Sequence, residues 1–437
     1  MLFRSRVSPS SSNTRQAEAA WDELAAVVGP EHVRPALPAD AVDGVPASRV
    51  IEPGTEETLA RVLASANRAG LAVVPRGGGT KLDWGHPPRR ADLVLSTTRL
   101  HRVLEHAWAD LTATVEAGCS VARFQATLAE HGQRLALDPL WPERATIGGI
   151  LATGDAGPLV ARFGSLRDLI IGVTLALPDG TLAKSGGKVV KNVAGYDLPK
   201  LATGSFGTLA VITQAVFRLH PLPHETRTLT FTAPSPAVEP LCELALAVQR
   251  SQLAFVALQV RAAGSGPSGL DVGFEGTGAG LDSQERAVLR LAPGVTRADP
   301  PPLVWRAREE LWRGREPAVT AKFSVLPAEL AEFCAMVREA AAAPPSLAWS
   351  LVAQAPGVGH LRLEAQTGDS LVVALARLRA GVERGGGTLA LLRCPLDVKA
   401  RLDVWGSPGD SLPLMRCVKA QLDPAGILNP GRFVGGI

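Results

Sequence analysis

Four segments of the chain combine glycine, small hydroxyl residues and basic residues in ways that suit ligand binding. The first is PRGGGTKLDWG (75–85), directly after a predicted strand. Three consecutive glycines permit positive φ and bring backbone N–H groups close to an anion, and Arg76 and Lys81 add positive charge. The segment has neither the GxGxxG spacing nor the GxxxxGK(S/T) pattern. By itself it predicts either a phosphate-binding loop or an ordinary turn.

The second segment, residues 138–168, is rich in small side chains. It contains ATIGG at 145–149 and continues with Ala152, Gly154 and Gly157. So many small residues in a short stretch predict a backbone that lies flat against a ligand, because no side chain holds the two apart. A helix that packs through its small residues would show the same pattern, so both interpretations stay open.

Two further segments lie nearer the C-terminus. In residues 186–213, Lys191 and Asn192 precede the only tyrosine of the chain, Tyr196, and Gly207 leads into a predicted buried strand. The fourth segment, LNPGR (428–432), places Asn429 directly before a Pro-Gly turn.

The composition limits the class of protein. The 437 residues are 46% hydrophobic, enough for a core, and the length suggests two or three domains at roughly 100–200 residues each. The 45 Lys+Arg and 42 Asp+Glu nearly cancel, to a net charge of +3, which argues against a dedicated nucleic-acid binder. The five cysteines form no CxxC pair, so we expect neither an iron–sulfur cluster nor a zinc site nor a disulfide framework.

The N-terminus and the apolar runs predict where the protein resides. Residues 1–16 are polar and rich in Ser and Arg, and they lack the apolar region of a signal peptide. No uncharged apolar run approaches the roughly 18 residues that a membrane helix needs. We therefore expect a cytoplasmic protein without a transmembrane segment, held peripherally at the inner face of a membrane at most, through partner subunits.

The predicted elements indicate an α+β fold. Residues 49–75 read as a strand, a helix capped by Thr55 and a second strand, after which hairpins follow to residue 222. Helices at 237–250, 282–291, 328–341 and 370–383 then alternate with strands at 253–261, 347–354, 359–365 and 388–393, and a last helix spans 412–422. The predicted organisation is a disordered tail (1–16), a helical lead-in (17–44), a first domain (45–222), a second domain (223–410) and a C-terminal segment (411–437).

The order of the four segments resembles the FAD-binding domain of the vanillyl-alcohol oxidase/p-cresol methylhydroxylase family. Within that family it is most similar to the FAD-binding E subunits of bacterial glycolate oxidases. The likeness lies in GDAGPLVARFGSLRDLIIG (154–172), KNVAGYDLPKLATGSFGTLAVIT (191–213) and QLDPAGILNPGRF (421–433). It implies a two-part FAD-binding domain of the p-cresol methylhydroxylase type over 45–222. A second α+β domain with an antiparallel sheet, of the FAD-linked oxidase C-terminal type, would follow over 223–410, and 411–437 would return to the flavin.

The resemblance also implies which residues hold FAD. The glycines of the first segment and Thr80 would bind the pyrophosphate, Thr146, Gly148 and Gly149 would line its other side, and Asn429 would approach the isoalloxazine ring. The implied cofactor residues are Pro75, Arg76, Gly77, Gly78, Gly79, Thr80, Lys81, Asp138, Pro139, Thr146, Ile147, Gly148, Gly149, Ala152, Gly154, Lys191, Asn192, Tyr196, Gly207, Val211, Ile212 and Asn429. Relatives that attach FAD through histidine carry it where this chain has Thr80, so we expect non-covalent FAD.

The second domain departs from the family pattern. Related D-2-hydroxyacid dehydrogenases carry an HxGDGNLH segment that binds a divalent metal and the substrate. The matching stretch here is APGVGHLR (355–362), with Ala355 and Arg362 at the two histidine positions. A methyl group and a guanidinium do not replace two imidazoles as ligands, so we expect no metal. His360, left alone, predicts a packing or surface residue, and no catalytic base can be named.

The substrate and partners follow only from the resemblance. Arg308 and Lys322 are the candidates for binding a substrate carboxylate, although a charged surface helix would look the same. The implied function is an FAD-binding subunit of a complex that oxidises glycolate, a small 2-hydroxy acid, to glyoxylate. Its implied partners are a sister FAD subunit with metal-binding histidines and an iron–sulfur subunit. Two alternatives stay open: a self-sufficient FAD-dependent dehydrogenase of another hydroxy acid or alcohol, and a non-catalytic FAD-binding assembly subunit.

Overall fold

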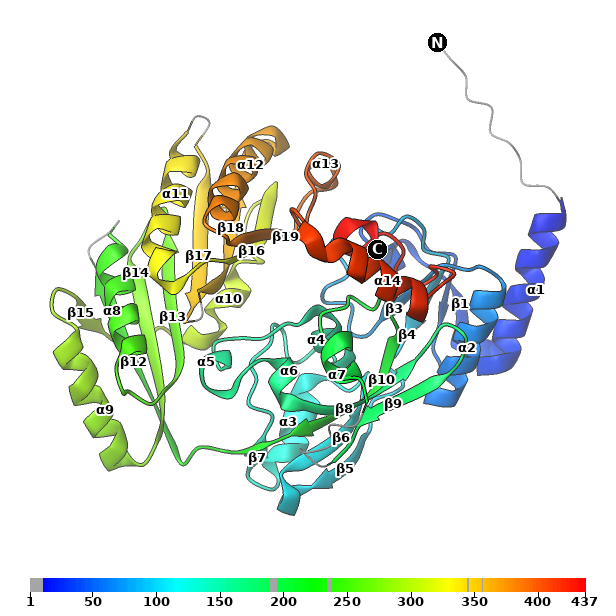
Figure 1. Cartoon of the computed structure of the whole chain (residues 1–437), viewed down its shortest axis with the longest axis horizontal. Helices are drawn as coiled ribbons and strands as arrows, with labels where there is room; N and C mark the ends of the chain where they lie inside the picture. The colour runs from blue at the N-terminus through cyan, green and yellow to red at the C-terminus, as the bar shows by residue number, and fades with distance from the viewer. Residues whose placement is uncertain (1–10, 189–194, 234–236, 344–345, 356) are drawn as a thin grey trace, which may run out of the picture.

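The structure, a computed structural model, divides into two lobes that face each other (Figure 1). It describes residues 11–188, 195–233, 237–343, 346–355 and 357–437. The first lobe holds the strands up to residue 221 and the C-terminal residues, and the second lobe holds the large sheet between them.

A small four-stranded sheet begins the first lobe. Its order is β1 (Val33–Pro35), β2 (Arg49–Ile51), β4 (Leu93–Ser96) and β3 (Val73–Arg76), with helices α1 (Ser11–Val28) and α2 (Glu56–Arg68). Thr55 caps α2 by accepting a hydrogen bond from the Thr58 amide at 3.2 Å, as the sequence predicts. Strand β4 lies between β2 and β3, parallel to both. Helix α1 begins at Ser11, within the stretch 1–16 for which the sequence predicts a tail.

A five-stranded antiparallel sheet completes the first lobe. Its order is β5 (Val103–Ala107), β6 (Thr112–Glu116), β10 (Val211–Arg218), β8 (Ile170–Ala176) and β9 (Leu182–Gly186). Strands β5–β6 and β8–β9 form hairpins within the stretch up to residue 222, where the sequence predicts hairpins. The smaller elements of this lobe are α3 (Val121–Ala129), α4 (Ile147–Thr153), α5 (Val160–Phe163), α6 (Leu166–Leu169), α7 (Leu198–Ala202) and the pair β7 (Gln133–Arg134) with β11 (His220–Pro221).

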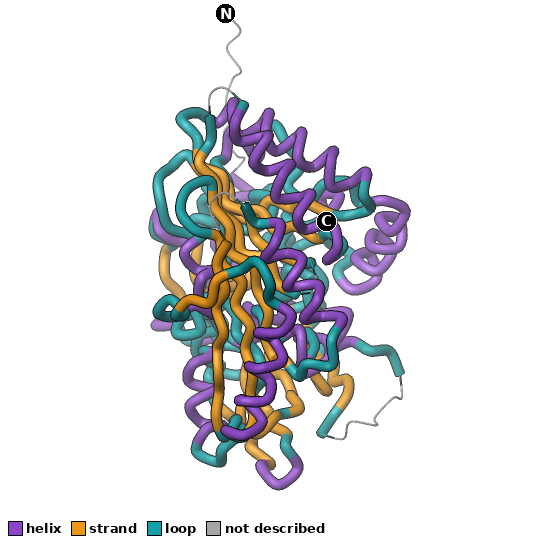
Figure 2. Tube along the Cα trace, turned by 90° about the vertical axis from the view of Figure 1, so that its left-hand side faces the viewer, coloured by secondary structure: helices purple, strands orange, loops and turns teal. Residues whose placement is uncertain are grey.

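The second lobe is an eight-stranded antiparallel sheet with helices packed on it (Figure 2). In sheet order, the strands are β15 (Thr296–Ala298), β12 (Glu225–Ala233), β14 (Ser268–Gly276), β13 (Phe255–Ala263), β17 (Ala348–Gln354), β18 (Val358–Glu364), β16 (Ala318–Ser324) and β19 (Thr388–Arg393). The helices are α8 (Glu239–Arg250), α9 (Gly278–Leu291), α10 (Ala307–Glu310), α11 (Leu330–Ala342), α12 (Gly368–Arg384) and α13 (Leu396–Lys399). The α+β class and the antiparallel second sheet are therefore confirmed.

Alternation along the strands of the second lobe decides which residues meet the first lobe. On β16, Ala321 and Phe323 pack into the core that the sheet forms with α8, α11 and α12, and Leu361 does so on β18. Because successive side chains point to opposite faces, Lys322 and His360 lie on the other face. These two residues are direct neighbours across the β16–β18 pair.

The C-terminal residues return to the first lobe (Figure 1). Helix α14 (Leu412–Leu422) carries Lys419, whose ammonium donates to the carbonyl oxygens of Thr208 and Leu428 at 2.7 and 3.0 Å. Leu428 pairs with Val73 of β3. Asn429 is thereby brought to the end of the strand that precedes the three glycines. Among the described residues, no helix is long and apolar enough to cross a membrane.

Candidate functional site

The two glycine-rich segments of the first lobe pack directly on each other. A β-carbon at Gly78 would overlap the carbonyl oxygen of Arg144, and one at Gly77 would overlap Oγ1 of Thr146. Of the three glycines only Gly79 has a positive φ, of 69°. Positions 77 and 78 thus require glycine because the segment at 144–146 lies too close for a side chain. Position 79 requires glycine because of its positive φ.

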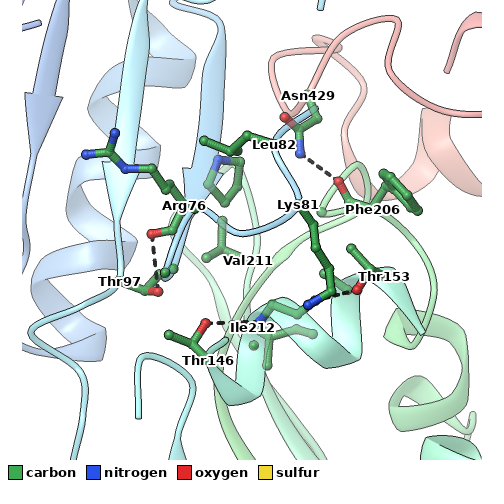
Figure 3. A pocket seen from close by; sticks show the side chains of 18 of the residues that line it. Arg76, Lys81, Leu82, Thr97, Thr146, Thr153, Phe206, Val211, Ile212 and Asn429 are labelled. Atoms are coloured by element: carbon green, nitrogen blue, oxygen red, sulfur yellow. Dashed lines mark hydrogen bonds between the residues drawn. The ribbon is translucent and has the colours of Figure 1, made fainter. Parts of the chain in front are cut away.

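The segments line a pocket at the junction of β3, α4 and β10 (Figure 3). Helix α4 includes Gly148 and Gly149, and Thr146 caps it by accepting a hydrogen bond from the Gly149 amide at 3.3 Å. The segment forms a short helix of small residues, and this helix lines the pocket; contact of its backbone with a ligand stays a prediction. The predicted cofactor residues found on its walls are Pro75, Arg76, Gly77, Gly78, Gly79, Thr80, Lys81, Thr146, Gly148, Gly149, Ala152, Gly207, Val211, Ile212 and Asn429.

The other predicted cofactor residues lie elsewhere. Ile147 is buried in the core of the first lobe, because the first turn of α4 directs it inward. Tyr196 is 90% exposed, since it directly precedes Asp197, which caps the surface helix α7. Gly154 lines a neighbouring cavity, and Asp138 and Pro139 line another one beside it. Lys191 and Asn192 lie outside the described residues.

The pocket also contains residues that the sequence analysis missed. They are Leu82, Thr97, Thr153, Phe206, Ala210 and Arg432. Arg432 follows the Pro-Gly turn of the fourth segment, so its position could have been inferred. Its guanidinium donates to the carbonyl oxygens of Leu82 and Trp84 at 2.6 and 2.8 Å, and burial lowers its pKa to about 10. Arg432 thereby holds the loop that follows the three glycines.

The two cations expected beside the three glycines already have carboxylate partners. The Arg76 guanidinium points away from the pocket (Figure 3) and binds Asp40 at 2.7 Å. The Lys81 ammonium lies 3.2 Å from Asp155, and burial lowers its pKa. Both residues line the pocket, as the sequence predicts, but each cation's nearest anion belongs to the protein.

Free hydrogen-bonding groups remain around the pocket. The amides of Gly77, Gly78, Gly79 and Thr80 donate no hydrogen bond to any described residue. The Asn429 side chain donates to the Phe206 carbonyl at 2.6 Å (Figure 3), but its Oδ1 is buried without a partner among the described residues. Unpaired donors beside a glycine cradle suit a phosphate, and a buried free acceptor suits a ring N–H or a hydroxyl group.

A second cavity, of about 150 Å³, adjoins the pocket between the two lobes. Thr153 and Phe206 line both spaces, so the two are neighbours. The second lobe contributes Arg308, Lys322 and His360 to the cavity. The two sequence candidates for carboxylate binding thus line the same cavity, Lys322 from strand β16 of the large sheet and Arg308 from helix α10.

Arg308 and Lys322 differ in their surroundings. Arg308 donates to Asp155 at 2.9 Å and to the Ala156 carbonyl at 2.7 Å, which ties the second lobe to the first. Burial raises the pKa of Asp155, but Arg308 and Lys81 outweigh it and hold that pKa low. The Lys322 ammonium has no hydrogen bond or ion pair within the described part of the chain, and burial lowers its pKa. Lys322 is therefore the cation that is free for an anionic ligand.

His360 is neither isolated nor on the surface. It is only 4% exposed, packs against the Trp312 ring at 5.4 Å and lines the cavity. Its Nδ1 is buried without a partner among the described residues. Burial, with the charges of Arg308 and Lys322, holds its pKa well below 6.5, so the imidazole is neutral at neutral pH. The sequence did carry a signal for this position. Apolar residues alternate along strand 358–364, so His360 should point to the face of the sheet that lies away from the core.

Comparisons with known proteins agree with this geometry. Residues 47–186 match the FAD binding domain family, and residues 407–433 match the C-terminal domain of FAD linked oxidases. The structure superimposes on p-cresol methylhydroxylase with substrate bound, at a TM-score of 0.75 and 16% identity over 98% of both chains. It also superimposes on alkyldihydroxyacetonephosphate synthase, at a TM-score of 0.74 and 16% identity over 99% of this chain and 88% of the other. The protein is thus a flavoprotein of the p-cresol methylhydroxylase fold, with FAD as its cofactor.

Relatives of known sequence indicate which kind of flavoprotein the chain resembles. Over 41% of this chain, the sequence is 35% identical to glycolate oxidase subunit GlcD of Bacillus subtilis (strain 168). Over 88% of this chain, it is 28% identical to mitochondrial D-lactate dehydrogenase (cytochrome) of Arabidopsis thaliana. It is 34% identical to D-2-hydroxyglutarate dehydrogenase of Xanthomonas citri pv. viticola over 42%. The matches span 38%, 73% and 39% of these relatives. The chain is a homologue of FAD-linked hydroxy-acid dehydrogenases, a glycolate oxidase subunit among them.

Proposed function

We propose that the chain is an FAD-dependent oxidoreductase that acts on 2-hydroxy acids. In the form that the sequence implies, it is the FAD-binding subunit of a complex that oxidises glycolate to glyoxylate and passes the electrons to a partner. The observation that carries the proposal is the second cavity. Next to the FAD pocket, it brings together Lys322, a half-buried cation without a partner among the described residues, and a neutral buried imidazole, His360.

The residues around the first pocket suit non-covalent FAD. The free amides of 77–80 donate to the pyrophosphate, and the first turn of α4, with Gly148 and Gly149, lies against it. Asn429 Oδ1 accepts a hydrogen bond from the isoalloxazine ring or the ribityl chain. Because Arg76 and Lys81 are bound to carboxylates, backbone dipoles carry most of the charge stabilisation.

Thr146→Ala tests the contact between α4 and FAD. The substitution removes the helix cap and lowers the free energy of unfolding by about 1 kcal/mol. It also weakens FAD retention, since the capped turn lines the pocket. Thr55→Ala is the matched control: it removes the cap of α2 but leaves FAD retention unchanged. Thermal unfolding and flavin retained on gel filtration measure the two effects, and equal retention in both variants contradicts the assignment.

Lys322 and His360 divide the work on the acid. The Lys322 ammonium binds the carboxylate, which also neutralises the charge that lowers the pKa of His360. FAD, when bound, supplies the oxidant that accepts a hydride from the carbon bearing the hydroxyl group. His360 accepts the hydroxyl proton, so the C–H and O–H bonds both break and a carbonyl group forms. Arg308 binds Asp155 and so holds the part of the cavity wall that the first lobe contributes. In this proposal it does not contact the substrate.

The electrons leave the chain through a partner. The five cysteines carry no cluster pattern, which supports a separate iron–sulfur subunit. A sister FAD subunit completes the proposed complex in the cytoplasm or at the inner face of the membrane. The glycolate oxidase relative from Bacillus subtilis is a D subunit. The proposal that this chain is an E subunit therefore rests on its own sequence motifs.

Flavin reduction by the isolated chain tests the proposed function. The purified protein should contain about one FAD, which 2-hydroxy acids bleach in the absence of oxygen. Glycolate and D-lactate are the first acids to add. Bound flavin that no 2-hydroxy acid bleaches favours the non-catalytic assembly subunit. A chain that reduces a soluble dye at full rate without partners favours the self-sufficient dehydrogenase.

Lys322→Met tests the carboxylate site. The apparent dissociation constant of the acid should rise by roughly 10–100-fold, because a charge-assisted hydrogen bond is lost. The melting temperature should stay the same or rise, since a half-buried ammonium that has no partner among the described residues disappears. Lys200→Met, which removes an exposed lysine paired with Asp197, is the control and changes neither quantity. Unchanged acid affinity in Lys322→Met would place the carboxylate elsewhere.

A further inference from the structure

The second cavity is larger and more aromatic than a two-carbon acid requires. Its charged and polar groups are Arg308, Lys322, Asp155, His360 and the hydroxyl group of Thr153. The remaining walls are mostly apolar, and they include the rings of Trp84, Phe206, Trp405 and Phe433. A cavity of about 150 Å³ has about the volume of an apolar protein cavity that takes up benzene, so it has room for one aromatic ring.

Three of these rings form a cluster from distant parts of the chain. The centroids of Phe206 and Trp405 lie 4.8 Å apart, those of Phe206 and Phe433 5.7 Å, and those of Trp405 and Phe433 5.3 Å. We call Phe206, Trp405 and Phe433 the aromatic triad. Trp405 and Phe433 remain partly exposed, so the triad still presents ring surface.

Phe206 is held in place at the boundary of the two spaces. Its φ is 56°, a conformation that is costly for a residue with a β-carbon. Its amide donates to the Ala152 carbonyl at 2.8 Å, and its carbonyl accepts from Asn429 at 2.6 Å. The surrounding backbone thus fixes an aromatic ring beside both the FAD pocket and the cavity.

These observations, together with the proposed function on which the inference rests, define a substrate class. We propose that the chain binds a 2-hydroxy acid with an aromatic side chain, whose carboxylate lies on Lys322 and whose ring packs against the aromatic triad. Offset and edge-to-face ring contacts stabilise such an arrangement beyond the burial of apolar area. Glycolate would fill only the charged end of the cavity and leave the triad without a partner.

Binding of two 2-oxo acids to the FAD-loaded chain tests the inference without turnover. Glyoxylate and phenylglyoxylate share the carboxylate and the carbonyl group and differ by the phenyl ring. Titration calorimetry and the shift of the flavin spectrum give their dissociation constants. Phenylglyoxylate should bind at least about tenfold more tightly. Phe433→Leu should reduce this ratio severalfold, and Trp108→Ala, which removes an exposed aromatic residue outside the cavity, should not change it.

The outcomes separate the inference from the proposed function. If glycolate bleaches the flavin and phenylglyoxylate binds no more tightly than glyoxylate, the aromatic substrate class is wrong and the proposed function stands. If the ratio is high but Phe433→Leu leaves it unchanged, the triad does not contact the ring and the inference is wrong. If neither acid binds to the loaded chain, both the inference and the proposed function fail.

Discussion

Gly78→Val purifies as a folded protein without FAD. A side chain at this position overlaps the carbonyl oxygen of Arg144, so the loop that contains the three glycines must move away from the segment at 144–149. The displacement removes the free amides of 77–80 from the pyrophosphate. Overpacking of this kind costs about 1–3 kcal/mol, and lost cofactor contacts add to it, so we expect FAD occupancy to fall at least tenfold.

The flavin-to-protein absorbance ratio measures the occupancy, and circular dichroism shows whether the chain is folded. Gly276→Val is the matched control, because a β-carbon at Gly276 meets nothing within 4 Å. It lies in the second lobe, at the end of β14, and should retain full FAD. Full occupancy in Gly78→Val would show that the pyrophosphate lies elsewhere.

His360→Gln slows flavin reduction by about 100-fold or more, while the affinity for the acid changes little. A positioned general base contributes roughly 10²–10⁴ to the rate, and glutamine keeps the size of the side chain without accepting the proton. Arg308, Lys322 and Asp155 are the charged groups that face His360, so the surrounding charge is the same in both proteins. Stopped-flow reduction over a range of acid concentrations separates the limiting rate from the dissociation constant.

The pH dependence of stability gives a second readout for His360. Its pKa in the folded chain lies well below the 6.5 of an exposed histidine. Below about pH 6.5 the unfolded chain therefore binds a proton that the folded chain excludes, and stability falls as the pH falls. His360→Gln loses less stability on acidification, whereas His224→Gln, at an exposed position, behaves like the parent.

The stopped-flow experiment decides the catalytic role. If His360→Gln reduces the flavin at the full rate, the imidazole of His360 is not the base that accepts the hydroxyl proton.

Local sequence was sufficient to predict the elements around the FAD pocket. Thr55 caps α2 and the hairpins β5–β6 and β8–β9 form, because capping side chains and alternating apolar residues act within a few positions of the chain. The strands β12, β14 and β16 were missed. Strand β14 contains three glycines and lies between β12 and β13, where Gly273 leaves room for the Trp305 ring. Its glycines therefore reflect contacts that no local pattern reveals.

The order of the four segments, through its resemblance to a family of FAD-binding domains, was enough to predict FAD as the cofactor. Their glycines and small residues record where backbone must approach a ligand or another segment, and this requirement is visible without the partner. Only the tertiary structure decided what the charged and titratable residues do. Arg76 and Lys81 are bound to carboxylates, Lys322 is free, and His360 faces a cavity instead of the solvent. Ion pairs and burial join residues from different lobes, so they exist only once the chain has folded.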